Sequence, residues 1–106
     1  MPWTVLFHEA AEAEFLALPE DVQARFERIR ALIAALGLER VPATYARHLE
    51  DKLWEFRLKG KDGIARALYV TMSGQRIFVV RVFVKKTQKT PRREINLALE
   101  RAKEIT

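Results

Sequence analysis

The sequence predicts a mixed α+β fold in a single domain over residues 1–106. Its apolar residues follow a helical period in the first third of the chain, alternate with a period of two from residue 53, and return to helical spacing after residue 91. With 49% apolar and 31% charged residues, the composition is that of a globular protein, and 106 residues suffice for one hydrophobic core. These observations give the expected element order β-α-α-β-β-β-α.

One strand and two helices are expected in the N-terminal part of the chain. Residues 3–7 are rich in aromatic and β-branched side chains, which predicts a short strand. Apolar side chains then recur at helical spacing in two stretches, the first ended by Pro19 and the second by Gly37. Residues 38–51 show no clean period, so a connecting loop is expected there, with room for one helical turn.

Three consecutive strands and a final helix are expected in the C-terminal part. The alternating segments are residues 53–59, 64–72 and 76–84, and glycine-containing turns join them. Such turns predict an antiparallel sheet, with the two N-terminal helices packed on one face and the other face open to solvent. The C-terminal helix is expected to begin with Thr90 as its N-cap and Pro91 at its first position.

Positive charge is concentrated in one part of the chain. Residues 52–93 hold twelve lysines and arginines against two acids, whereas residues 1–51 hold five arginines against nine acids. A segment with a net charge of +10 is typical of a site for a polyanion, most often a nucleic acid. One alternative is a basic surface that contacts only water, and another is pairing of the bases with Glu55 and its neighbours. Two acids cannot neutralise twelve bases, so such pairing accounts for only a part of the charge.

Alternation of side chains along the strands assigns this charge to one face of the sheet. An arginine cannot be buried without a partner, so Arg57, Arg66 and Arg81 are expected to face solvent together. Strict alternation along the last strand places Arg81 and Phe83 on the same side as Val79. Arginine forks match phosphate oxygens, and an exposed aromatic ring such as that of Phe83 can stack on an unpaired base.

Three segments of the basic part form recognisable motifs: LWEFR at 53–57, GIARALY at 63–69 and FVKKTQKTP at 83–91. With these motifs the chain resembles the RelE/HigB superfamily of toxins from bacterial toxin–antitoxin pairs, most closely its phage-derived HigB-like branch. The resemblance implies a RelE-like fold and an mRNA endoribonuclease that acts on ribosome-bound message in the cytoplasm. It also implies a cognate antitoxin that is encoded nearby and is expected to be a helix-turn-helix protein.

The resemblance and the strand faces together indicate which residues act on RNA. The catalytic candidates are Arg57, Arg66, Arg81 and Lys85. Among them Arg81 departs from the family pattern and is assigned by its face on the sheet alone. The RNA-binding candidates are Lys59, Lys61, Phe83, Lys86 and Lys89. Cleavage through the 2′-OH requires stabilisation of a phosphorane, for which arginines are suited, and a proton for the 5′-oxygen, which a lysine can supply.

Other chemistries are excluded or lack support. The chain has no cysteine, which removes disulfides, thiolate metal sites and cysteine nucleophiles. The two histidines, His8 and His48, are far apart in the sequence and have no carboxylate cluster beside them, so neither a metal nor another cofactor is expected. No apolar stretch is long enough to span a membrane. The alternative function is a non-catalytic RNA- or DNA-binding module, such as a decayed toxin or a regulator, held by an antitoxin partner.

Overall fold

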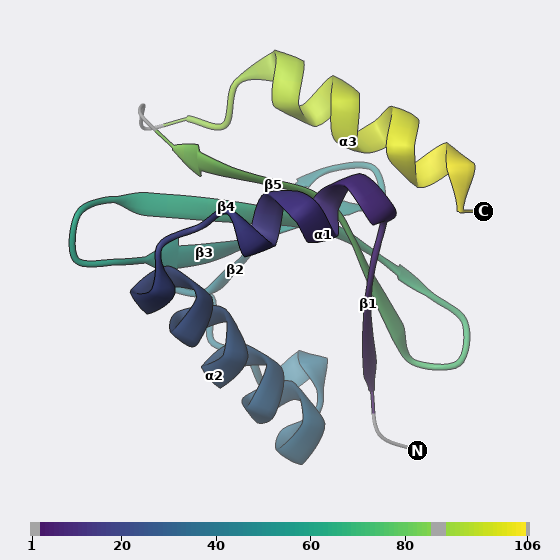
Figure 1. Ribbon diagram of the computed structural model, residues 1–106. Coiled ribbons are helices and arrows are strands. Elements are labelled where there is room, and N and C mark those ends of the chain that lie inside the picture. Colours follow the sequence, from purple (N-terminus) through teal and green to yellow (C-terminus); the bar gives the residue numbers. More distant parts are fainter. Residues whose placement is uncertain (1–2, 86–88, 106) are drawn as a thin grey trace.

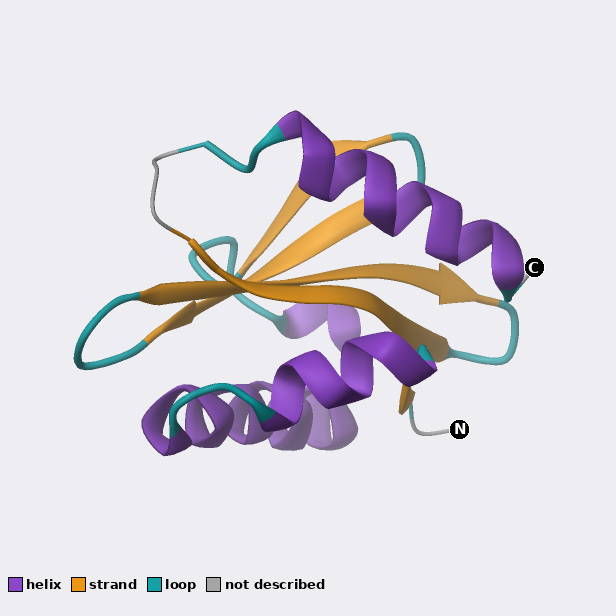
Figure 2. Cartoon of the chain, turned by 45° about the horizontal axis from the view of Figure 1, so that its top comes forward, coloured by secondary structure: helices purple, strands orange, loops and turns teal. Residues whose placement is uncertain are grey.

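A five-stranded sheet separates two layers of helices in the computed structural model, which describes residues 3–85 and 89–105 (Figure 1). The strands are β1 (Thr4–Phe7), β2 (Ala46–Glu50), β3 (Leu53–Lys59), β4 (Ile64–Met72) and β5 (Arg76–Lys85). The helices are α1 (Glu9–Leu16), α2 (Glu20–Leu36) and α3 (Arg92–Glu104), and a short 3-10 turn, η1, spans Leu38–Arg40. Figure 2 shows α1 and α2 on one side of the sheet and α3 on the other.

The strands lie in the order β1-β5-β4-β3-β2. β3, β4 and β5 form the expected antiparallel meander, and β2 extends it beside β3. β1 instead pairs in parallel with β5, so the sheet is mostly rather than wholly antiparallel. The long connection between β1 and β5 permits this, because parallel neighbours need a crossover of a dozen or more residues. The predicted α+β class is confirmed.

The ends of the helices follow from residues that stop or start a helical backbone. α2 begins directly after Pro19 and ends at Gly37, whose φ of 93° favours glycine. α3 begins one residue later than expected, because Pro91 occupies the N-cap position. The hydroxyl of Thr90 is used elsewhere and donates a 2.7 Å hydrogen bond to Oε1 of Glu55. None of the helices in residues 3–85 and 89–105 is long and apolar enough to cross a membrane.

Residues 38–51 contain one helical turn, η1, as the sequence allows, but the prediction of a loop is wrong over β2. As an edge strand, β2 pairs with β3 alone, and its register shifts between His48 and Glu50. Its two apolar side chains point to opposite faces, since Ala46 packs with the core beside α1 and α2 and Leu49 with the core under α3. No apolar stripe with a period of two results, and exposed polar residues are common on edge strands.

Each face of the sheet carries its own hydrophobic core. The core against α1 and α2 is centred on the aromatic rings of Phe7, Phe15, Phe26 and Phe56. The core under α3 contains Leu53, Leu68, Val70, Val80, Phe83, Ile95 and Ala98. The expectation that this second face is open to solvent is therefore wrong over the part that α3 covers. The expectation that Arg66 faces solvent is also wrong, because it is only 4% exposed, while Arg57 and Arg81 are half-buried.

A β-bulge at Val80 changes the face of the second half of β5. Leu68 of β4 pairs with Arg81, whereas the next residue, Tyr69, pairs with Val79, so Val80 is left without a partner on β4. Val79 consequently lies in the core against α1 and α2, and Val80 lies in the core under α3. Strict alternation, which places Val79 on the same side as Arg81, is wrong for this reason.

Candidate catalytic site

Four cationic side chains gather on the α3 side of the sheet, one from each of β2, β3, β4 and β5. They are Arg47, Arg57, Arg66 and Lys85, and we call them the basic cluster. Arg57 and Arg66 are direct neighbours across β3 and β4. The positive charges of the three arginines each lower the pKa of Lys85, which places all four groups within electrostatic reach of one another. The structure thus brings three of the four predicted catalytic residues together.

One buried carboxylate, that of Glu55, lies within the basic cluster. Glu55 is 1% exposed, and its Oε1 lies 3.6 Å from Nε of Arg66. The same oxygen accepts the hydrogen bond from Thr90, and Arg47 lies directly opposite Glu55 in the register of β2 and β3. Pairing with Glu55 is therefore present for Arg66, but one carboxylate leaves the cluster with a net positive charge. Through Thr90, Glu55 also ties the N-terminal end of α3 to the sheet.

Two donors of the basic cluster make no hydrogen bond in the described part of the chain. The Nε atoms of Arg57 and Arg66 are buried and make no hydrogen bond with any residue that the structure describes. Buried N–H groups are usually paired, and leaving one unpaired costs about 1–3 kcal/mol. Phosphate oxygens accept hydrogen bonds from arginine in pairs, at short distance and with favourable charge. An anionic oxygen that reached these donors would satisfy them.

Burial and like charge change the acidity of the basic cluster. Burial lowers the pKa of Lys85, and the charge of Arg66 lowers it further, while the carboxylate of Glu55 partly opposes both effects. Burial likewise lowers the pKa of Arg66, although a guanidinium group stays protonated in proteins. Lys85 therefore releases its proton more readily than an ordinary lysine, as a proton donor to a leaving oxygen requires.

Arg81 faces the same side of the sheet but belongs to a different group of charges. Its guanidinium forms a 2.7 Å ion pair with Glu94 of α3 and a second ion pair with Glu14 of α1. The hydrogen bond to Glu94 raises the pKa of Arg81, although burial opposes this. Arg81 also lies over the ring of Phe83, 5.7 Å from its centroid. These contacts neutralise the charge of Arg81 within the protein, and this geometry does not favour a catalytic role. The catalytic role of Arg81 stays a prediction.

The predicted RNA-binding residues are distributed over separate places. Phe83 is 8% exposed and lies in the core under α3, so the expectation of an exposed ring that stacks on a base is wrong. α3 covers this part of the face, which the alternation within a strand cannot reveal. Lys59 and Lys61 are exposed at and beside the end of β3, and Lys89 is exposed before α3. Lys86 lies outside the described residues.

Arg47 is the member of the basic cluster that sequence reasoning misses. Its signal is weak because β2 lacks an alternating apolar stripe, and only its pairing with Glu55 brings it to the cluster. Both histidines lie elsewhere: His8 is the N-cap of α1, and His48 packs against Trp54 with ring centroids 5.1 Å apart. Within the described part of the chain, no group of three or more His, Asp or Glu side chains could hold a metal ion.

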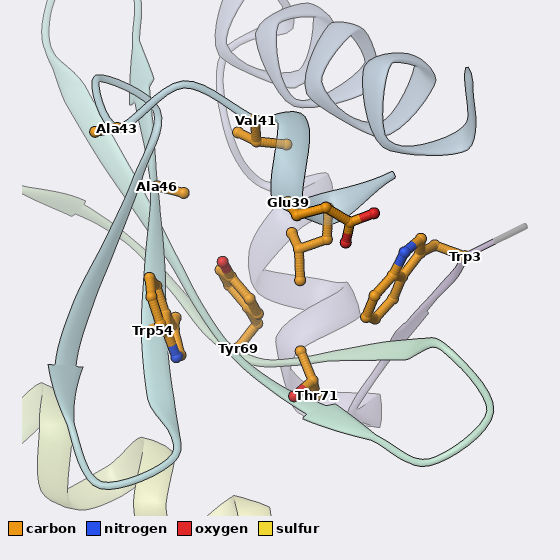
Figure 3. A pocket seen from close by; sticks show the side chains of 9 residues that line it. Trp3, Glu39, Val41, Ala43, Ala46, Trp54, Tyr69 and Thr71 are labelled. Atoms are coloured by element: carbon orange, nitrogen blue, oxygen red, sulfur yellow. The ribbon is translucent and has the colours of Figure 1, made fainter. Parts of the chain in front are cut away.

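A separate pocket of about 440 Å³ lies on the opposite face of the sheet (Figure 3). Trp3, Trp54 and Tyr69 line it together with residues of η1 and the segment that follows. Of the described residues around it, only Glu39 carries a charge. Burial raises the pKa of the Tyr69 phenol far above its usual range. The described lining of this pocket holds no cationic side chain, so the basic cluster, which holds four, is the candidate site for an anionic substrate.

Comparisons with known proteins agree with this fold. The family described as Phage derived protein Gp49-like (DUF891) matches residues 13–103, whereas no curated protein sequence matches the chain. The E. coli toxin RelE, solved in the free state as a mutant with two arginines replaced, is 20% identical over 100% of both chains, with a TM-score of 0.60. A chain of the archaeal RelE–RelB complex from Pyrococcus horikoshii OT3 is 21% identical, over 79% of this chain and 96% of that chain, with a TM-score of 0.56. The RelE-like fold expected from the sequence motifs is confirmed.

Proposed function

The chain belongs to the Gp49-like family of phage-derived proteins and has the fold of RelE, and on this basis we propose that it is the toxin of a toxin–antitoxin pair. The activity we propose is metal-independent cleavage of mRNA by the basic cluster. One observation carries this proposal: the buried Nε donors of Arg57 and Arg66 make no hydrogen bond with a described residue, although Glu55 lies 3.6 Å from Nε of Arg66, and Lys85, whose pKa is lowered, lies beside them.

The proposed reaction is attack of a 2′-oxygen of the RNA on the adjacent phosphorus. The bond from phosphorus to the 5′-oxygen breaks, and a 2′,3′-cyclic phosphate forms. Arg57 and Arg66 bind the phosphate oxygens and stabilise the additional negative charge of the phosphorane. Lys85 donates a proton to the departing 5′-oxygen, and the proton of the 2′-OH passes to water. Arg47 extends the positive surface toward the edge of the sheet.

We expect cleavage to depend on the ribosome, because the basic cluster contains no evident general base. Its members are cations around one buried carboxylate, and both histidines lie elsewhere. Such a site stabilises charge well but supplies little general-base catalysis. Holding the message in the geometry of attack can contribute about 7–11 kcal/mol in favourable cases. We therefore expect rapid cleavage of message on ribosomes, in the cytoplasm, and slow cleavage of free RNA.

A cognate antitoxin is the second partner in the proposal. One of the structures similar to this chain is a RelE–RelB complex. The net positive charge of residues 52–93 favours an acidic segment of the antitoxin, because complementary charge speeds and orients association. That the antitoxin is a helix-turn-helix protein is a prediction from the resemblance of the sequence.

Replacement of Arg66 by lysine tests the catalytic part of the proposal. Lysine keeps the charge but lacks the planar fork that binds two phosphate oxygens at once. We expect Arg66→Lys to bind ribosomes within a few-fold of wild type and to lose about 2.7–4 kcal/mol of transition-state stabilisation, a hundredfold or more in rate. Mapping of message ends in a translating extract measures the cleavage. Arg40→Lys changes an exposed arginine in η1 and should cut as wild type does.

The outcomes separate the two candidate functions. Full cleavage by Arg66→Lys would remove Arg66 from the catalytic role. If the folded wild-type protein binds RNA but cuts neither free nor ribosome-bound message, the chain is a non-catalytic RNA- or DNA-binding module. Expression without an antitoxin gives an independent readout, since a message-cutting toxin arrests growth and a binding module does not cleave translated messages.

A further inference from the structure

A second basic site lies outside the basic cluster, where α2 meets the turn between β3 and β4. An open hollow of about 440 Å³ is lined there by Arg25 and Arg28 of α2 and by Lys59 and Lys61 of the β3–β4 hairpin. The two segments are far apart in the sequence, but Figure 1 shows the hairpin turn beside the beginning of α2. We call this feature the hairpin hollow.

Two contacts fix the hairpin against α2. The backbone N–H of Lys61 donates a 2.5 Å hydrogen bond to Oδ2 of Asp21. Gly60 lies so close to α2 that a Cβ atom there would be 2.6 Å from Cγ2 of Val22 and 3.0 Å from Oδ2 of Asp21. Only glycine permits this approach without a shift of the helix or the turn. The four cationic side chains are therefore presented together by a defined backbone.

Among the described lining residues, the hairpin hollow holds four cationic side chains against one acid, Asp21. No ion pair joins Arg25, Arg28, Lys59 or Lys61 to a carboxylate in the part of the chain that the structure describes. Asp21 is the one acid among the described lining residues, and it already accepts the hydrogen bond from the hairpin backbone. Four such cations around one hollow create a positive potential that attracts an anion. Arginine and lysine side chains together are typical of sites for phosphate groups.

The hairpin hollow and the basic cluster both adjoin the last residues of β3. Arg57 and Lys59 are two residues apart on β3, so they point to the same side and lie roughly 7 Å apart along the strand. Arg57 belongs to the basic cluster, and Lys59 lines the hollow. The basic cluster lies on the α3 side of the sheet and α2 on the other side, so an RNA strand that leaves the cluster along β3 reaches the hollow by turning round the hairpin end of the sheet.

We propose that the hairpin hollow is a second phosphate-binding site, which holds the backbone of the same RNA strand at a nucleotide beyond the scissile bond. This inference rests on the proposed function for the presence of an RNA strand at the basic cluster. It assigns Arg25 and Arg28 of α2 to RNA binding, although the sequence alone gives no reason to separate them from other exposed helix residues. The hollow contributes to affinity and to the orientation of the strand, not to the chemical step.

Binding of non-cleavable RNA tests the proposal independently of catalysis. Single-stranded 2′-O-methyl RNAs of two lengths are used, one that covers only the basic cluster and one long enough to reach the hollow. The variant Arg25→Gln/Arg28→Gln should weaken binding of the long RNA about tenfold and leave the short RNA unchanged. Its plot of log affinity against log salt should become shallower by about 0.7 for each phosphate group that the variant no longer binds. Fluorescence anisotropy gives both values, and thermal unfolding verifies that the variant is folded.

Arg40→Gln/Lys52→Gln is the matched control, because it removes the same charge from exposed positions in η1 and at the opposite end of β3. An equal loss for both double variants would mean that net charge alone is responsible, and the proposal would fall. No loss for the long RNA, with weaker binding to ribosomes, would assign the phosphate to a second RNA and likewise overturn it. A further outcome is that the wild-type protein cuts no message while the Arg25→Gln/Arg28→Gln variant still loses affinity for the long RNA only. That result would contradict the proposed function and support the hairpin hollow as a phosphate site.

Discussion

Arg57 and Arg66 lie directly opposite each other on β3 and β4, and the buried Nε atoms of both lack a hydrogen-bond partner among the described residues. Like charges in this position destabilise a sheet, and unpaired buried donors add to the cost. Glu55 compensates this for Arg66 alone, at 3.6 Å. We therefore expect this pair to lower the stability of the free protein and to favour a ligand that brings negatively charged oxygens.

Replacement of Arg57 by methionine should therefore stabilise the fold while it removes activity. Methionine replaces the apolar stem of the side chain, lacks the guanidinium and so removes the repulsion with Arg66. We expect a gain of about 0.2–1 kcal/mol in the free energy of unfolding, the range for a cross-strand pair. Urea unfolding measures the gain, and cleavage in a translating extract should fall at least tenfold. Loss of stability in this variant would show that Arg57 is held by contacts that the register does not reveal.

Replacement of Glu55 by glutamine should destabilise the protein more than replacement of any residue of the basic cluster. The variant keeps the shape of the side chain but leaves the cations of the cluster without a counter-charge. Breaking a buried ion pair typically costs about 3–5 kcal/mol. Thr90→Val, which removes only the hydroxyl that donates to Glu55, should cost about 1.5–3 kcal/mol. Added polyphosphate should restore more stability to Glu55→Gln than to Thr90→Val, and equal recovery would contradict the role of Glu55 as counter-charge.

The pH dependence of cleavage should report the protonation of Lys85. Burial and the charge of Arg66 lower the pKa of Lys85, and the proposed proton donor is the protonated form. Activity should consequently be present below this pKa and fall as the pH rises through it, below the ordinary lysine value of 10.5. Lys85→Arg keeps the charge but does not lose its proton in this range, so it should cut more slowly and without the alkaline fall. Single-turnover rates on ribosome-bound message, corrected for hydrolysis without protein, measure both profiles.

Glu14 forms hydrogen bonds with the edge of β5, beyond the residues of β5 that pair with β1. Its Oε1 accepts hydrogen bonds from the backbone N–H of Val82 at 3.0 Å and from Arg101 at 2.9 Å. Arg101 in turn donates to the carbonyl of Val80, which is the bulged residue. The ion pair of Glu14 with Arg81 completes the contact between α1, β5 and α3. Backbone groups that the short β1 strand cannot reach are thus satisfied by side chains from two helices.

Replacement of Glu14 by glutamine should lower stability by about 1–3 kcal/mol, because it weakens bonds to partly buried donors. The difference from wild type should depend on pH. Burial raises the pKa of Glu14, but the hydrogen bonds from Arg101 and Val82 and the nearby arginine charges outweigh this and lower it overall. The stability that Glu14 contributes is therefore present above its unfolded value, near 4.5, and is lost as the pH falls through the lower folded value. Urea unfolding of both proteins across this acidic range should show the difference shrink, and a constant difference would contradict the assignment.

Much of the fold follows from local patterns in the sequence. The periods of apolar residues predict α1, α2, the three strands of the meander and α3, because each element must bury a face that its own residues define. Pro19 and Gly37 mark helix ends since proline and glycine restrict or permit backbone angles by themselves. The same local alternation places Arg57 and Arg66 on one face of adjacent strands, which the register confirms.

Only the tertiary structure decides how the charges of that face are divided. β2 and its Arg47 join the sheet through pairing with β3. No period of apolar residues within 38–51 predicts this pairing. The bulge at Val80 depends on the pairing of β4 with β5, and it cannot be read from β5 alone. α3 then buries Phe83, and its Glu94 binds Arg81, so one arginine of the predicted set is paired with acids from two helices. Alternation along a strand predicts the side to which a residue points. The partners of that residue come from segments distant in the sequence, and they determine whether its charge is neutralised or left to bind a ligand.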